Sequence, residues 1–144
     1  MPNWSESHSE HHGHGLQLIP YEIINLASGN IAQPPYANKT LLDNQILKGE
    51  SFVDINPVTA SKYGLSQGDR IAISSGKGKE TVLVNLFNGA MPGMVYMPMG
   101  FGHTAYDAFA QGQGASPNNL IEDKQDPLTG LPVWWNTSVI ITKV

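Results

Sequence analysis

Residues 52–78 constrain the fold more than any other stretch, because each part of them favours one local structure. Residues 52–55 form a short β-prone run. The Asn56-Pro57 step after it predicts a helix, with Asn56 as the N-cap and Pro57 at the first helical position, where its missing N–H costs nothing. Gly64 can take the left-handed conformation that ends a helix. The stretch therefore predicts a strand followed by less than two turns of helix.

The remaining patterned segments predict strands joined by tight turns. Residues 70–74 alternate like a half-buried strand, and residues 76–78 favour a hairpin turn into the next strand. Residues 80–87 and 94–99 continue the series, and residues 138–144 predict a closing strand. With 15 Gly and 10 Pro in the chain, a turn-rich, mostly β protein is expected.

The first apolar run, residues 16–27, contains Pro20, which cannot donate to a central β-ladder. We expect an edge or bulged strand there, ended by Ser28-Gly29. Before this run, residues 1–15 are polar, rich in Gly and His and without periodicity, which predicts disorder. The histidines of this segment either chelate a transition metal flexibly or belong to a linker that binds nothing.

Composition narrows the classes of function. The chain has 144 residues, enough for one domain, which we expect over residues 16–144. A net charge of −4 without a cluster of Lys or Arg argues against nucleic acid, and no apolar run is long enough for membrane insertion. The absence of Cys excludes disulfides and cysteine-held metals within these residues. Only 14% of the residues are charged, which indicates that a partner covers part of the surface.

Residues 100–114 form the most chemically suggestive segment. Glycines such as Gly102 let backbone N–H groups approach an anion or a ring closely, and His103 and Thr104 add directed donors. The structural alternative is that His103 caps a helix over residues 104–110.

Two further motifs follow. Asn118 and Asn119 carry amides with two donors and one acceptor each, which suits them to read the edge of a purine or pterin ring. Residues 126–132 then read Asp-Pro-Leu-Thr-Gly-Leu-Pro, and Trp134-Trp135 precede the last strand.

Taken in order, these motifs resemble the C-terminal molybdopterin-dinucleotide-binding domain of the dimethyl-sulfoxide-reductase family of molybdenum and tungsten oxidoreductases. One anchor is the series Asn-Pro, short helix, Gly-Asp, strand and Gly turn within residues 55–76, and the other is residues 126–132. The Gly-His-Thr of residues 102–104 is similar to the polysulfide-, thiosulfate- and quinone-linked members. Ile121 departs from the family, which places a hydroxyl side chain there. The resemblance covers residues 16–144.

The resemblance implies a mostly β fold, a six-stranded double-psi β-barrel with short helices. Such a barrel binds and orients molybdopterin guanine dinucleotide, whose molybdenum or tungsten is held mainly by other domains, so the chain alone is not expected to catalyse a reaction. The implied partners are the remaining domains of the catalytic subunit, together with iron–sulfur and membrane-anchor subunits of a bacterial-type respiratory complex at one face of the membrane. The implied cofactor contacts are Ser28, Gly29, Asn56, Asp69, Gly102, His103, Thr104, Asn118 and Asn119.

Other interpretations stay open or are weaker. On one of them, the barrel is a structural and interaction module of a quinone-linked complex that has lost the cofactor. For Asp69, which follows Gly68, capping a turn is the alternative to contacting a ligand. A free-standing hydrolase is disfavoured because the chain has no Gly-x-Ser-x-Gly elbow, and residues 76–79 lack the spacing of a phosphate-binding P-loop.

Overall fold

The computed structural model describes residues 15–26, 36, 39–105, 108 and 110–144; the His-rich start and Ser28-Gly29 lie outside them. The strands are β1 (Leu16–Tyr21), β2 (Ile46–Leu47), β3 (Glu50–Ile55), β4 (Arg70–Ser74), β5 (Lys79–Leu86), β6 (Met94–Pro98) and β7 (Thr137–Lys143). The helical pieces are α2 (Pro57–Lys62) and the 3-10 turns η1 (Ile24–Leu26) and η2 (Pro117–Asn119). Within the described residues, no helix has the length and apolar character to cross a membrane.

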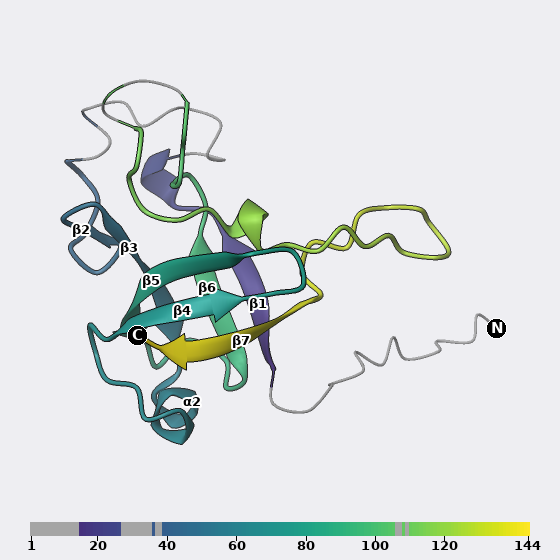
Figure 1. The fold of residues 1–144 in the computed structure, drawn as a ribbon, viewed down its shortest axis with the longest axis horizontal. Helices are drawn as coiled ribbons and strands as arrows, with labels where there is room; N and C mark the ends of the chain where they lie inside the picture. The colour runs from purple at the N-terminus through teal and green to yellow at the C-terminus, as the bar shows by residue number, and fades with distance from the viewer. Residues whose placement is uncertain (1–14, 27–35, 37–38, 106–107, 109) are drawn as a thin grey trace.

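Six of the strands close into a barrel (Figure 1). Their order around the wall is β3-β5-β4-β7-β1-β6, and β6 pairs again with β3, while β2 adds a short edge to β3. The pairs β1–β6 and β3–β5 are parallel and the others are antiparallel. The expected mostly β, six-stranded barrel is confirmed. The double-psi connection pattern is consistent with this order and stays a prediction.

The barrel interior is filled by aliphatic side chains from alternate strand positions. In β1, for example, buried and half-buried residues alternate along the whole strand, as expected for a wall with one face inward. The fully buried residues of the main core include Leu18, Val53, Ile55, Ile71, Ile73, Val82, Val84, Val95 and Met97. A second, smaller cluster of Ile23, Leu26 and Phe101 packs outside this core.

The strand predicted in residues 16–27 is observed over Leu16–Tyr21, but the edge alternative of the expected edge or bulged strand is wrong for the strand as a whole. β1 has two neighbours, because Leu16 to Leu18 pair with β7 while Gln17 to Tyr21 pair with β6. Pro20 lies beyond the last residue that pairs with β7, where β1 has β6 alone as a partner. The missing N–H of Pro20 is therefore tolerated because the β7 pairing ends before this residue, although β1 is not an edge strand.

The expected helix start and stop are both confirmed. The Asn56 Oδ1 atom accepts a hydrogen bond from the Val58 N–H at 2.9 Å, and Pro57 occupies the first turn of α2. The Asn56 Nδ2 atom also donates to the Ala90 carbonyl at 2.8 Å, which ties the helix to the turn between β5 and β6. Gly64 ends the helix with φ +63°, in the left-handed region. Asn56 thus holds two parts of the chain together from one buried position.

We predict that Asn56→Ala lowers the free energy of unfolding by about 2 kcal/mol, because it removes a helix cap and leaves the Ala90 carbonyl without its donor. The measurement is urea unfolding followed by circular dichroism. Asn56→Ser is the matched control: its hydroxyl keeps a cap acceptor, it loses the donor to Ala90 and it should fall between the wild type and Asn56→Ala. Equal losses for the two variants would contradict a capping role.

Candidate functional site

The predicted site residues that the structure describes fall at opposite ends of the barrel (Figure 1). The loops that carry Gly102, His103 and Thr104 lie at the same end as η2, which carries Asn118 and Asn119. Asn56 lies at the other end, at the start of α2. We call the first of these the loop end of the barrel.

The segment after β6 folds back on itself at the loop end. The Gly102 N–H donates to the Gln113 carbonyl at 2.7 Å, and the Gly112 N–H donates to the His103 carbonyl at 3.1 Å. Gln111 adds a side-chain hydrogen bond to the Thr104 carbonyl at 3.0 Å. The described residues of the alternative helix, 104, 105, 108 and 110, are in bends and turns, and residues 106, 107 and 109 lie outside the described part.

Glycine is required at two positions of this fold-back by close packing. A Cβ on Gly102 would lie 2.5 Å from the Ser116 backbone nitrogen, and one on Gly114 would lie 2.9 Å from the Phe101 Cβ. Both glycines also have positive φ angles, +77° and +65°. These glycines bring two stretches of the protein's own backbone together, which is a structural reason for them independent of any ligand.

The turn η2 aims two consecutive amides in different directions. Leu120, directly after it, is fully buried in the main core and anchors the turn to the barrel. In a 3-10 turn, neighbouring side chains point about 120° apart, since there are three residues per turn. Asn118 and Asn119 are both exposed, and they line two different clefts.

The two clefts differ in chemistry. The polar cleft, of about 360 Å³, is lined by Glu80, Gly102, His103, Thr104, Gln111, Gly112, Gly114 and Asn119. The aromatic cleft, of about 600 Å³, is lined by Pro20, Tyr21, Glu22, Met99, Asn118, Ile121 and Trp134. Five predicted residues therefore line two clefts that share η2 as their common border.

Glu80 is a polar-cleft residue that the sequence did not reveal. The Asn119 Nδ2 atom donates to the Glu80 Oε1 atom at 2.6 Å, across 39 positions of sequence. The contact exists because η2 packs on the β4–β5 hairpin, where a Cβ on Gly78 would lie 2.5 Å from the Asn119 carbonyl oxygen. Glu80 is therefore identified as part of the site only by the tertiary packing of Gly78 against Asn119.

Tyr21, also missed from the sequence, connects the aromatic cleft to the barrel wall. Burial and the nearby Asp54 carboxylate raise the pKa of the Tyr21 phenol well above its ordinary value, so the hydroxyl stays a neutral donor to Asp54. Burial also raises the pKa of Asp54, against the opposing effect of its hydrogen bonds from Asn85 and Tyr21. Asn85 donates to the Asp54 Oδ1 atom at 2.6 Å. This network orients Tyr21 at the cleft wall.

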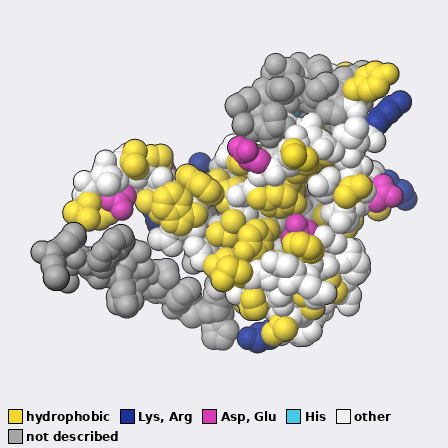
Figure 2. All heavy atoms as spheres, turned by 180° about the vertical axis from the view of Figure 1, so that it is seen from behind, with side chains coloured by type: hydrophobic (Ala, Val, Ile, Leu, Met, Phe, Trp, Pro, Cys, Tyr) yellow, Lys and Arg dark blue, Asp and Glu magenta, His cyan; other side chains and the backbone are white. Residues whose placement is uncertain are grey.

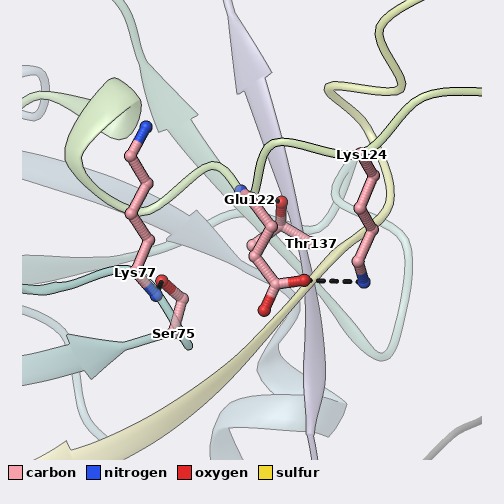
Figure 3. Close-up of polar contacts among 5 residues, drawn as sticks. All are labelled: Ser75, Lys77, Glu122, Lys124 and Thr137. Carbon is pink, nitrogen blue, oxygen red and sulfur yellow. Dashed lines mark hydrogen bonds and ion pairs between the residues drawn. The ribbon is translucent and has the colours of Figure 1, made fainter.

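Beside the hairpin, charged side chains border the loop end (Figure 3). Lys124 and Glu122 form an ion pair at 2.6 Å, and the Lys77 side chain points away from this pair. The Glu122 N–H donates to the Thr137 hydroxyl at 3.0 Å, which fixes the chain as it leaves η2. The Ser75 hydroxyl accepts from the Lys77 N–H at 3.1 Å and shapes the hairpin. Among the described residues, no group of three or more His, Asp and Glu gathers to hold a metal.

The side chains of Asn56 and Asp69 form hydrogen bonds with other groups of the protein itself. Asn56 caps α2 and holds the β5–β6 turn, as described above. The Asp69 Oδ2 atom accepts from the Ser66 N–H at 2.8 Å and forms an ion pair with Lys143 at 2.6 Å. These bonds match the turn-capping alternative for Asp69. The described clefts are lined by neither residue.

Comparison with known proteins gives consistent matches. A family model described as the molydopterin dinucleotide binding domain matches residues 32–136. The menaquinone reductase molybdopterin-binding-like subunit of Nitratidesulfovibrio vulgaris is 41% identical over 128 residues, which is 89% of this chain and 18% of that protein. The arsenate respiratory reductase molybdopterin-containing subunit of a Shewanella species is 36% identical over 92 residues, 60% of this chain and 11% of that protein.

A solved structure shares the fold. Acetylene hydratase from Pelobacter acetylenicus superposes with a TM-score of 0.68 over 90% of this chain and 18% of its own, at 17% identity. The chain thus spans less than a fifth of the length of each of these three proteins.

We predict that Gly78→Ala destabilises the protein by about 1–3 kcal/mol, because its Cβ forces the Asn119 carbonyl and η2 away from the hairpin. Gly76→Ala in the same hairpin is the control, since its Cβ meets only the movable Glu122 carboxylate, 2.9 Å away. Thermal unfolding gives the stability, and amide chemical shifts of residues 117–121 report the displacement. Unchanged shifts in Gly78→Ala would show that η2 does not depend on this contact.

Asp69 should contribute to acid sensitivity. The hydrogen bonds from Lys143 and the Ser66 N–H hold the pKa of Asp69 below its ordinary value of 3.8. A lowered folded-state pKa stabilises the protein above the unfolded value, and this contribution disappears as pH falls through the folded pKa. We therefore predict that Asp69→Asn loses stability at neutral pH and that its deficit shrinks below about pH 4. Urea unfolding across pH tests this, and a deficit independent of pH would refute it.

Proposed function

The chain belongs to the molybdopterin-dinucleotide-binding domain family, the C-terminal domain of larger molybdopterin oxidoreductase subunits, and on that premise we propose that the loop end of the barrel is the cofactor-contacting face. The cofactor that the family match supports is molybdopterin guanine dinucleotide. The residues we assign to it are Gly102, His103, Thr104, Asn118 and Asn119, with Glu80, Tyr21 and Trp134 added from the structure.

The proposal rests on one observation, that the neighbouring side chains of Asn118 and Asn119 line two different clefts. A dinucleotide has two ring systems joined by a pyrophosphate, so its site needs two recognition elements a short distance apart. The two amides stand next to each other on η2 and line separate clefts. A buried Leu120 holds both in place, which supports a rigid border between the two ring systems.

The chemistry of the polar cleft suits a guanine edge. Guanine presents two neighbouring N–H donors and one carbonyl acceptor. A carboxylate accepts from such donors and a side-chain amide can donate to the carbonyl, so the neighbouring Glu80 and Asn119 together match that pattern. The aromatic cleft, with Tyr21, Met99 and Trp134, offers apolar surface for a planar ring.

The donor set of the loop end therefore fits an organic dinucleotide better than a metal ion. When bound, the cofactor supplies redox chemistry at molybdenum or tungsten, and this chain's residues bind and orient the dinucleotide. We further propose that Asn56, Asp69 and the β5–β6 turn act only in the fold. Ser28 and Gly29 stay predictions, because they lie outside the described residues. Association with iron–sulfur and membrane-anchor subunits is likewise proposed.

A second candidate function is that of a structural barrel without cofactor. The observation that favours it is the name of the relative at 41% identity, a molybdopterin-binding-like subunit of a menaquinone reductase. On this reading the loop end contacts protein, and the Glu80–Asn119 hydrogen bond is a permanent part of the fold.

We predict that titration of the chain with GDP, followed by heteronuclear NMR, produces saturable shifts at residues 102–104, 111 and 118–119. ADP should bind more weakly, because adenine lacks the N–H pair that a carboxylate accepts. Glu80→Gln should weaken GDP binding about tenfold, since a hydrogen bond to a charged group is lost.

The control is Asp43→Asn, which removes an exposed carboxylate that lines none of the described clefts and should leave GDP binding unchanged. No shifts at millimolar GDP, together with no molybdenum or tungsten in the purified native subunit, would refute the cofactor-contacting face and support the structural barrel.

A further inference from the structure

Residues 123–136, which we call the arm, leave the barrel between η2 and β7 and project from it as a narrow loop (Figure 1). The arm carries four large apolar side chains that are exposed. Leu128 is 93% exposed, Leu131 63%, Trp134 48% and Trp135 47%. Seen from behind, hydrophobic side chains cover part of the arm and continue across its base onto the adjoining face of the barrel (Figure 2).

The arm is held in one shape by its own hydrogen bonds. The Val133 N–H donates to the Lys124 carbonyl and the Asp126 N–H donates to the Leu131 carbonyl, at 2.8 and 2.9 Å. The Asp126 Oδ1 atom accepts from the N–H groups of Leu128 and Thr129, at 2.8 and 2.9 Å. These bonds lower the pKa of Asp126, so its carboxylate stays charged and keeps the turn closed.

The base of the arm is fixed to the barrel. The Gln17 side chain donates to the Trp135 carbonyl at 2.7 Å, and the rings of Trp134 and Trp135 meet edge to face with centroids 5.3 Å apart. An ordered backbone that presents exposed Trp and Leu side chains is typical of a docking element, because little conformational entropy is lost when the apolar groups are covered.

We propose that the arm docks against an apolar groove on the larger remaining part of the same molybdopterin subunit. We choose this docking partner because of the length of the relatives. The barrel makes up about a fifth or less of each relative, so most of each such subunit lies outside the barrel. This inference rests on the proposed function insofar as it takes the barrel to be one domain of such a subunit.

The position of the arm supports this occupant. Trp134 lines the aromatic cleft, so a surface that covers Trp134 also borders the proposed cofactor site. The charges of the arm indicate which charge the rim of the groove carries. Lys124 is paired with Glu122, while Asp123 and Asp126 leave the arm acidic, so the rim is expected to be basic.

Hydroxyl-radical footprinting tests the docking. The isolated 144-residue chain and the whole native subunit, purified from its own cells, are oxidised in parallel and read by mass spectrometry. We expect Leu128, Leu131 and the two tryptophans to be strongly protected in the subunit, and Phe87 and Met91, exposed near α2, to react equally in both. Equal oxidation of the arm in both samples, or protection of Phe87 and Met91 to the same extent, would overturn the proposal.

A second copy of the chain is the competing occupant. If the arm becomes protected in the isolated chain as its concentration rises, with dimers in sedimentation velocity, the arm is a self-association surface and the proposal is overturned.

A double variant gives an independent readout. Leu128→Asp with Leu131→Asp should leave the melting temperature of the isolated chain unchanged, since both side chains are exposed. In the native subunit it should increase tryptic cleavage between the barrel and the remainder about tenfold, the loss expected for one interface anchor. Met91→Asp is the matched control and should not change cleavage. Identical cleavage of the double variant and the wild type would contradict docking by the arm.

These results are separable from the nucleotide titration. GDP binding to the isolated chain, with an arm that stays unprotected in the native subunit, would refute only the docking. A protected arm, with neither GDP binding nor molybdenum or tungsten in the native subunit, would refute only the cofactor-contacting face.

Discussion

The pairing of β3 with both β5 and β6 is the constraint on which the rest of the structure depends. It joins the two ends of the strand order into a closed wall through contacts at Asp54–Tyr96 and Ile55–Val95. Closure removes long unpaired strand edges and gives the wall one dry interior. Every loop at the cleft-bearing end starts from this wall, so the relative placement of β1, β6 and η2 follows from the closure.

Different interactions hold the connecting segments at the two ends of the barrel. At the α2 end, one buried side chain, Asn56, binds both the helix and the β5–β6 turn. At the loop end, backbone groups of residues 102–103 and 112–113 pair with each other, and Leu120 enters the core directly after two exposed amides. The first arrangement leaves few polar groups for a ligand, whereas at the loop end an exposed amide, a half-buried imidazole and a half-buried carboxylate line the polar cleft. This difference is the basis on which we propose the loop end as the binding face.

Local features could be predicted from the sequence because their causes are local. The Asn56 cap and the Gly64 stop depend on the conformational preferences of single residues, and both are observed. The placement of β1 could not be predicted from Pro20, because the stagger between β6 and β7 decides which backbone groups need partners. Likewise, Glu80 reaches Asn119 only through the packing of Gly78, and Tyr21 reaches Asp54 only across the barrel wall.

The position of β7 has a consequence for biosynthesis. β7 lies between β4 and β1, and it is the last strand of the barrel to be synthesised. The wall therefore has a gap until residues 137–143 leave the ribosome, and the pairing between β1 and β7 joins positions more than a hundred residues apart. Such distant contacts form slowly. We infer that this domain folds after its translation is complete, and that nascent chains ending before residue 137 would remain sensitive to protease; early resistance would disprove this order of events.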